Sequence, residues 1–164
     1  MKTLYLIRHA KSSKEDATLR DFDRPLNNRG HNDAEFMAAH LKFLNVQPDL
    51  IICSPAKRTL STAEQFALAL QYPLGKIQQE LSIYEATPSE LYEVIHQIGD
   101  SNKIVLLIGH NPSISLFTNG YTKEISTLVP TCSVVHFKSE AETWSKFNPE
   151  NATFVNLVNP SDFI

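Results

Sequence analysis

Three short apolar runs, separated by stretches with helical periodicity, constrain this chain more than any other feature of its sequence. The runs cover residues 4–7, 49–53 and 104–108. Each is too short for a helix and is composed largely of Leu, Ile and Val, which is typical of strands buried on both faces. Residues 133–138 and 153–158 are expected to form two further strands. Strands that alternate with helices predict an α/β fold.

Three stretches place apolar residues on one face at helical spacing. The first predicted helix carries Ala34, Met37, Ala38, Leu41 and Leu44 on that face. The second is predicted to start at Ser54-Pro55, with the serine as N-cap and the proline at the first helical position. Its inward residues are Leu60, Ala63, Phe66, Ala67 and Leu70. The third is predicted to open near Thr87-Pro88-Ser89-Glu90 and to bury Leu91, Val94, Ile95 and Ile98.

Length and composition exclude several classes of protein. The 164 residues suit one domain over residues 1–164, and 42% apolar with 20% charged residues is typical of a soluble globular protein. No apolar run approaches the about 20 residues of a membrane span, and the run before Arg8 is too short for a signal peptide. The formal charge of -3 gives no basic excess for nucleic-acid binding.

The two cysteines, Cys53 and Cys132, are far apart and have no metal-type spacing. We expect two free buried thiols rather than a disulfide, and therefore a cytoplasmic protein as the default. The sequence suggests no cofactor, and we expect the protein to act as a monomer.

Ionisable residues follow three of the predicted strands. Arg8-His9 ends the first, Arg58 lies in the first turn of the helix after the second, and His110 follows the third in Gly109-His110-Asn111-Pro112. Because the carboxyl ends of parallel strands form the ligand site of open α/β sheets, two Arg and two His are expected to converge there.

Such a convergence is unfavourable without an anion, since an arginine cannot lose its proton. A dianionic phosphoryl group would neutralise both guanidinium groups and accept their hydrogen bonds. A neutral imidazole is also a competent nucleophile. The residues therefore favour phosphoryl transfer, in which positioning and charge stabilisation supply most of the catalysis.

Three ordered motifs resemble those of the histidine phosphatase superfamily. Leu6-Ile7-Arg8-His9-Ala10 is similar to its Arg-His-Gly signature, residues 54–63 to its second motif, and residues 109–112 to the motif of its second histidine. The short length and the segment Asp21-Phe22-Asp23-Arg24-Pro25-Leu26 look most like the SixA-like phosphohistidine phosphatase branch. The resemblance implies a three-layer α/β/α sandwich with a mainly parallel central sheet, as in phosphoglycerate mutases.

Carried over residue by residue, the resemblance makes His9 the nucleophile, with Arg8, Arg58 and His110 binding the phosphoryl oxygens. Ser12 matches a phosphate-side serine of some relatives. The implied activity needs no metal and has a phosphorylated protein as substrate.

Two positions depart from the family pattern. Ala10 stands where many members have glycine, which is tolerable if its φ stays negative. Glu15 stands where larger relatives often have a phosphate-binding asparagine, so we expect that contact to be missing.

The proton donor is less defined. Glu85, ahead of the third helix, is the candidate, although a leaving imidazole needs less help than an alcohol. As alternatives, Glu85 is an exposed acid before a helix, and Ser12 and Arg24 are ordinary loop residues. The open site expected here favours a phosphorylated protein, while a small-molecule phosphomonoesterase and a non-catalytic module that binds phosphate or phosphohistidine remain alternatives. A zinc hydrolase using His9 and His110 lacks an obvious third ligand.

Overall fold

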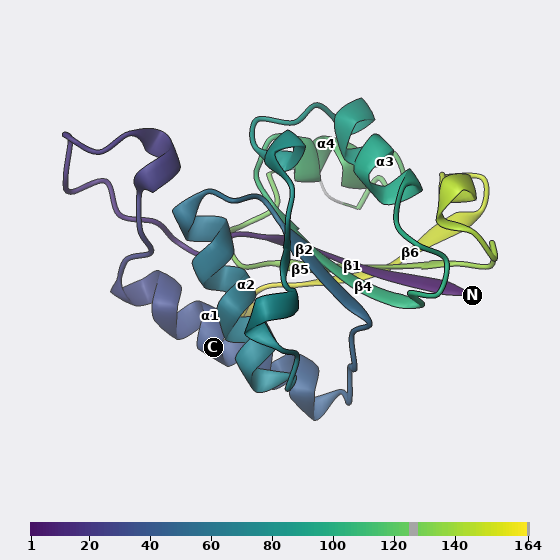
Figure 1. Ribbon diagram of the computed structural model, residues 1–164, viewed down its shortest axis with the longest axis horizontal. Coiled ribbons are helices and arrows are strands. Elements are labelled where there is room, and N and C mark those ends of the chain that lie inside the picture. The colour runs from purple at the N-terminus through teal and green to yellow at the C-terminus, as the bar shows by residue number, and fades with distance from the viewer. Residues whose placement is uncertain (125–127, 164) are drawn as a thin grey trace.

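The computed structural model describes residues 1–124 and 128–163, which surround a six-stranded sheet (Figure 1). The strands are β1 Lys2–Arg8, β2 Leu50–Cys53, β3 Gln78–Gln79, β4 Ile104–Gly109, β5 Val134–Ser139 and β6 Ala152–Val158. Their order is β3-β2-β4-β1-β5-β6, and β3, β2, β4 and β1 run parallel to one another. Strand β5 pairs antiparallel with β1 on one side and with β6 on the other. The predicted mainly parallel sheet is confirmed.

Helices cover both faces of the sheet. They are α1 Asn28–Phe43, α2 Lys57–Ala69, α3 Pro88–His96 and α4 Ser113–Asn119. Figure 1 shows α1 and α2 on one face and α3 and α4 on the other, which confirms the three-layer sandwich. The sequence did not predict α4, because its seven residues are too few to establish a helical period. Within the described ranges no helix has the length and apolar character needed to cross a membrane.

The apolar strands are buried on both faces because successive side chains point in opposite directions. Leu4 and Leu6 of β1 belong to the core under α3 and α4, whereas Ile7 belongs to the core under α1 and α2. In β4, Leu107 and Ile108 divide in the same way. Two cores filled from one sheet explain why these runs show no polar alternation.

The first and third predicted helices are confirmed as α1 and α3, except at the C-terminal end of α1. In α3, Thr87 and Glu90 form a reciprocal capping box. In α1, Leu44 does not point inward as predicted: it is the C-cap and is 52% exposed. The chain leaves the helix there, since Asn45 adopts a positive φ of 60°.

The predicted start of the second helix is wrong by two residues. Helix α2 begins at Lys57 after an Ala56 N-cap, and no side chain caps it. The Ser54 hydroxyl is used elsewhere, in a contact with His110. The inward face is as predicted, with Ala63, Phe66 and Ala67 buried and Leu60 and Leu70 packed against the same core.

The polar connection between β1 and α1 extends beyond the carboxyl end of β1 (Figure 1). It contains a short 3-10 turn, η1, at Asp21–Asp23. A β-bridge between Ser12 and Leu26 holds its two ends together. The tip of this segment, η1, reaches the residues that follow β2 through contacts with Arg58.

Candidate active site

The sheet brings the predicted histidines together at its carboxyl edge. Arg8 pairs with Gly109 in the β1–β4 register, so the residues that follow, His9 and His110, are neighbours. Their ring centroids are 5.4 Å apart. Arg58 enters from the first turn of α2, as predicted. All three side chains are buried in the described structure, with His9 7%, Arg58 5% and His110 6% exposed.

His9 is neutral and has a fixed tautomer. Its Nδ1 lies 2.7 Å from the carbonyl oxygen of Ala10. Because a carbonyl only accepts, Nδ1 carries the hydrogen and Nε2 keeps its lone pair. Burial lowers the pKa of His9 to about 4, a shift that the Ala10 hydrogen bond opposes and that Arg58, Arg8 and Arg24 reinforce. At neutral pH the Nε2 atom is therefore available as a nucleophile.

The turn after His9 is also held by its backbone. The N–H of Ala10 donates to the hydroxyl of Thr62 at 3.0 Å, and Thr62 donates to the carbonyl of Arg58 at 2.7 Å. Ala10 is not among the residues with positive φ, so the alanine fits where relatives have glycine. This link fixes the turn that carries His9 to the helix that carries Arg58.

Ser54 is a site residue that the sequence interpretation missed. Its Oγ lies 2.8 Å from Nε2 of His110 and accepts the N–H of Ala56 at 3.2 Å. When the hydroxyl donates to Nε2, the hydrogen of neutral His110 is on Nδ1, which is buried with no partner among the described residues. Burial, with His9 and Arg58 nearby, lowers the pKa of His110 to about 3. Ser54 directly follows β2, so the strand-end rule could have identified it.

The two arginines are tethered by their terminal nitrogens. Arg8 donates from Nη1 to the carbonyl of Val129 at 2.8 Å. Arg58 donates from Nη1 and Nη2 to the carbonyl and carboxylate of Asp21, at 2.6 and 2.9 Å. In both arginines Nε is buried and has no hydrogen-bond partner in the described residues. Each side chain thus keeps an unpaired donor.

Two adjoining hollows open at these residues. The first, here called the basic hollow, has a volume of about 220 Å³ and is lined by Arg8, His9, Lys11, Ser12, Lys14, Arg24, Arg58, His110, Asn111 and Thr131. The second, the outer hollow, has a volume of about 490 Å³ and is lined by Asp21, Arg58, Tyr84, Glu85, Ala86, His110, Asn111, Pro112 and Ser113. They share Arg58, His110 and Asn111, so a phosphoryl group and the rest of a substrate could occupy adjacent spaces.

Every predicted site residue lines one of these hollows. Ser12 lines the basic hollow and accepts a hydrogen bond from Nη1 of Arg24 at 2.7 Å. Glu85 lines the outer hollow, is exposed, and has a positive φ of 58°. A left-handed conformation costs a non-glycine residue energy, and such positions are common at functional sites. Glu15, where we expected a phosphate contact to be missing, is exposed and is not among the residues that line the hollows.

Asp21, Arg24 and Tyr84 complete the surroundings of Arg58. Arg24 was interpreted as a possible loop residue, and Asp21 and Tyr84 were given no role. The Tyr84 ring packs edge-on against His110 and against Phe22, with centroids 5.4 and 5.1 Å apart. The excess of cations in the predicted site was the signal that an acid such as Asp21 lies nearby.

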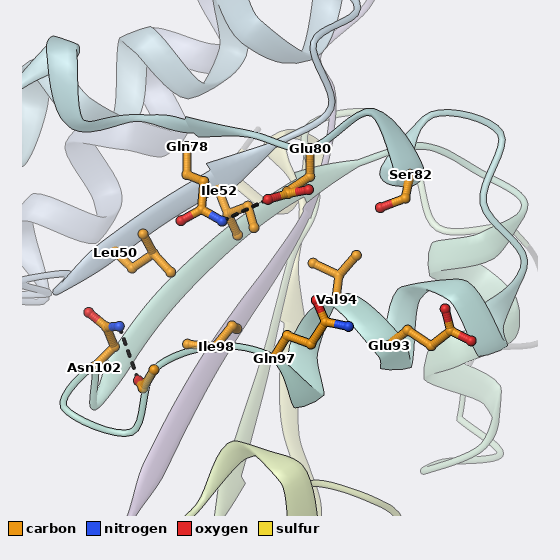
Figure 2. Close-up of a pocket in the computed structure, with 11 residues that line it drawn as sticks. Leu50, Ile52, Gln78, Glu80, Ser82, Glu93, Val94, Gln97, Ile98 and Asn102 are labelled. Atoms are coloured by element: carbon orange, nitrogen blue, oxygen red, sulfur yellow. Dashed lines mark hydrogen bonds between the residues drawn. The ribbon is translucent and has the colours of Figure 1, made fainter.

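A separate hollow of about 200 Å³ lies between the β2–β3 edge and α3 (Figure 2). Figure 2 shows Leu50, Ile52 and Val94 with the amide and acid groups of Gln78, Glu80 and Glu93. Its lining contains no histidine or arginine. It therefore lacks the groups that bind a phosphoryl dianion.

The described residues contain no group of three or more His, Cys, Asp or Glu side chains placed to hold a metal ion. Cys53 and Cys132 are buried and free, as predicted. Burial raises the pKa of Cys53 to about 12, so this thiol is not a thiolate nucleophile at neutral pH.

Comparisons with known proteins agree with this arrangement. Residues 4–82 match the model of the histidine phosphatase superfamily (branch 1), a span that includes His9 and Arg58. An uncharacterized protein of Mycobacterium tuberculosis is 28% identical over 164 residues, covering 94% of this chain and 99% of that protein. An uncharacterized chloroplastic protein of Arabidopsis thaliana is 48% identical over 61 residues, 37% of this chain and 28% of that protein.

Two solved structures share the fold along nearly the whole chain. A protein of Agrobacterium tumefaciens, provisionally named phosphohistidine phosphatase SixA, has a TM-score of 0.82 at 24% identity, covering 97% of this chain and 98% of that one. The protein histidine phosphatase SixA complexed with tungstate has a TM-score of 0.78 at 19% identity, covering 99% of both chains. At these identities the likeness establishes a SixA-like fold. Together with the match of residues 4–82, just under half of the chain, and the two histidines at adjacent strand ends, it makes this chain similar to the histidine phosphatase superfamily.

Proposed function

We propose that this protein is a metal-independent phosphatase that transfers the phosphoryl group of its substrate to His9 and then to water. The observation that carries the proposal is the state of His9: buried beside His110, neutral, and held by Ala10 so that Nε2 is free. A neutral imidazole in a fixed orientation needs no separate base to become a nucleophile. The match of residues 4–82 to the histidine phosphatase superfamily model supports a phosphatase hydrolase.

In the first step, Nε2 of His9 attacks phosphorus in line. The bond from phosphorus to the leaving group breaks, and the leaving group departs with the electron pair. Arg8 and Arg58 line the basic hollow and supply positive charge, and His110 lines both hollows beside them. These groups stabilise the three equatorial oxygens, where the charge of the transition state is spread.

In the second step, water attacks the phosphorus of phospho-His9. The bond between phosphorus and Nε2 breaks, inorganic phosphate is released, and His9 returns to its neutral state. Desolvation favours this return, because the same burial that lowers the pKa of His9 disfavours its cationic form.

We propose phosphohistidine in a protein as the substrate class. The chain between α2 and β4 contains only short elements and α3, with no inserted domain over the outer hollow. Tyr84 and Glu85 on its rim are half-buried and exposed. The SixA-like fold agrees with this substrate.

A small phosphomonoester is the second candidate substrate, and the position of Glu85 in the outer hollow favours it. An alcohol leaving group requires a proton, and Glu85 lines the hollow that would hold that group. Glu85→Gln should slow hydrolysis of an alkyl phosphate by roughly 10²-fold or more and leave phosphohistidine hydrolysis nearly unchanged. Equal effects on the two substrates would contradict the assignment of Glu85 as proton donor.

The nucleophile is tested by incubating the wild type, His9→Ala and the exposed-histidine control His31→Ala with p-nitrophenyl phosphate and a phosphohistidine peptide, both in chelator. We expect the wild type and His31→Ala to release phosphate and His9→Ala to release none. Mass spectrometry of the trapped wild-type enzyme should locate the phosphoryl group on the peptide containing His9. Full activity of His9→Ala, or loss of wild-type activity in chelator, would contradict the proposal.

A further inference from the structure

We propose that Asp21 is a positioning residue of the phosphoryl site, which fixes the guanidinium groups of Arg58 and Arg24 where they can bind the phosphoryl group. The proposal rests on the proposed function and extends it to a residue outside the strand-end motifs. Among the described residues Asp21 makes no hydrogen bond to His9 or His110, so we infer that it acts through the arginines.

Five hydrogen bonds from three side chains end on Asp21. Its Oδ1 accepts from Nε and Nη2 of Arg24, at 3.0 and 2.9 Å. Its Oδ2 accepts from Nη2 of Arg58 at 2.9 Å and from the Tyr84 hydroxyl at 2.6 Å. Its backbone carbonyl accepts from Nη1 of Arg58 at 2.6 Å. Oδ1 thus binds Arg24 alone, whereas Oδ2 is shared between Arg58 and Tyr84, which come from different parts of the chain.

These contacts join three segments that are distant in sequence. Asp21 lies in η1, Arg58 in α2, and Tyr84 just after the 3-10 turn η3 at Leu81–Ile83. The edge-on packing of Phe22 against Tyr84 adds an apolar contact between the first and third segments. A side chain that binds all three segments can set the distance between the two arginines.

Charge explains why an acid is needed at this point. The basic hollow contains Arg8, Lys11, Lys14, Arg24 and Arg58, whose like charges repel. Asp21 is the carboxylate that pairs with both Arg24 and Arg58 in the described structure. Without it, Arg58 would be a buried cation with no carboxylate partner, an arrangement that is strongly unfavourable.

The atoms that Asp21 uses favour positioning over competition with the substrate. It takes the terminal nitrogens of Arg58 and leaves Nε, which is buried and unpartnered among the described residues. Arg8 follows the same plan, with Nη1 on the carbonyl of Val129 and an unpartnered Nε. Neither Asp21 nor Val129 is among the residues that line the basic hollow, which indicates that both act as tethers of the arginines.

The first experiment compares Asp21→Asn with Asp23→Asn. Both changes replace a carboxylate by an amide in the same turn, but within the described residues the ion pair of Asp23 is with Arg20, at the surface. We expect Asp21→Asn to lower kcat by roughly 10- to 100-fold, the size expected when a catalytic group is displaced by about an ångström. The Kd for tungstate, measured by calorimetry on the whole protein, should rise in parallel. Asp23→Asn should match the wild type in both measurements.

The second experiment tests whether Asp21 acts through Arg58. In an Arg58→Ala background, the further change Asp21→Asn should alter tungstate affinity and kcat less than about twofold, because the group that it positions is absent. A purely structural role would give the same penalty in both backgrounds and would be accompanied by an equal loss of thermal stability. Asp21→Glu, which keeps the charge, should bind tungstate with an affinity between those of the wild type and Asp21→Asn.

The outcomes separate this proposal from its alternatives. Tighter tungstate binding by Asp21→Asn would show that Asp21 competes with the phosphoryl group, and unchanged binding would show that it has no role. Asp21→Glu binding no better than Asp21→Asn would contradict a role for the charge. Tungstate binding needs no turnover, so the test stands even if the wild type hydrolyses neither substrate and the proposed function fails.

Discussion

Single hydrogen bonds select the form of each site histidine. The Ala10 carbonyl holds the hydrogen of His9 on Nδ1, and the Ser54 hydroxyl contacts Nε2 of His110. When the Ser54 hydroxyl donates to His110, the two imidazoles, whose centroids are 5.4 Å apart, differ in form: His9 keeps a lone pair on Nε2 and His110 keeps its hydrogen on Nδ1. At the residue scale, the site depends on the partner of each ring nitrogen.

Ser54→Ala should lower kcat roughly tenfold or more, because His110 loses the contact that keeps its hydrogen on Nδ1. The measurement is steady-state hydrolysis of a phosphohistidine peptide, with the fold checked by circular dichroism. Ser139→Ala is the matched control, since Ser139 is equally buried and donates to Asn151 at the far end of β5. If both variants lose the same activity, the tautomer argument for His110 is wrong.

At the scale of elements, the start of α1 presses directly on the turn that carries His9. A Cβ atom added to Gly30 would lie 2.0 Å from the carbonyl oxygen of Lys11, whose neighbour Ala10 binds His9. The atoms in the way belong to the backbone, so no side-chain rotation can relieve the contact. Gly30 is therefore required by close approach and not by its φ, which is not positive.

Gly30→Ala should destabilise the protein by about 1–3 kcal/mol, the typical cost of overpacking, and should also lower kcat by shifting Lys11 and the turn beside it. Gly75→Ala is the control, because its added Cβ would meet nothing within 4 Å. The free energy of unfolding in urea and the phosphatase activity are measured for both variants and compared with those of the wild type. A Gly30→Ala protein with wild-type stability and activity would contradict the close packing of α1 against this turn.

At the scale of the whole molecule, the two buried neutral histidines make the free energy of unfolding depend on pH. The pKa values of His9 and His110 are lowered to about 4 and about 3 from an unfolded value near 6.5. Well above pH 6.5 both states are neutral and the histidines do not affect stability. As the pH falls from about 6.5 toward 4, only the unfolded chain takes up these protons, so the free energy of unfolding decreases.

The expected slope is up to about 1.4 kcal/mol per pH unit for each of these histidines. The measurement is urea unfolding at pH 7 and pH 5 for the wild type, His9→Gln and His31→Gln. The loss of stability between the two pH values should be smaller for His9→Gln than for the wild type, and unchanged for the exposed His31. Equal losses in all three proteins would show that His9 is not kept neutral by the fold.

Much of the architecture could be predicted from local pattern. The runs at β1, β2 and β4 could be identified because a strand buried on both faces is short and continuously apolar. The start of α3 could be identified because Thr87 and Glu90 cap it within the sequence itself. The starting residue of α2 could not, because Ser54 has a choice of partners: the helix end after it or His110, which lies 56 residues further along the chain.

The sequence by itself determined the α/β class, the strand ends, and the convergence of Arg8, His9, Arg58 and His110. These follow from periodicity and from the rule that parallel strands end at one edge, whereas the three-layer sandwich was implied by the family resemblance. Only the tertiary structure decided which carboxylate accompanies the arginines and which nitrogen of each histidine is free. Those outcomes depend on hydrogen bonds such as Asp21 to Arg58 and Ser54 to His110, between residues 37 and 56 positions apart. Contacts at that separation leave no periodic trace in the sequence, because they are selected by distance and angle once the sheet has assembled.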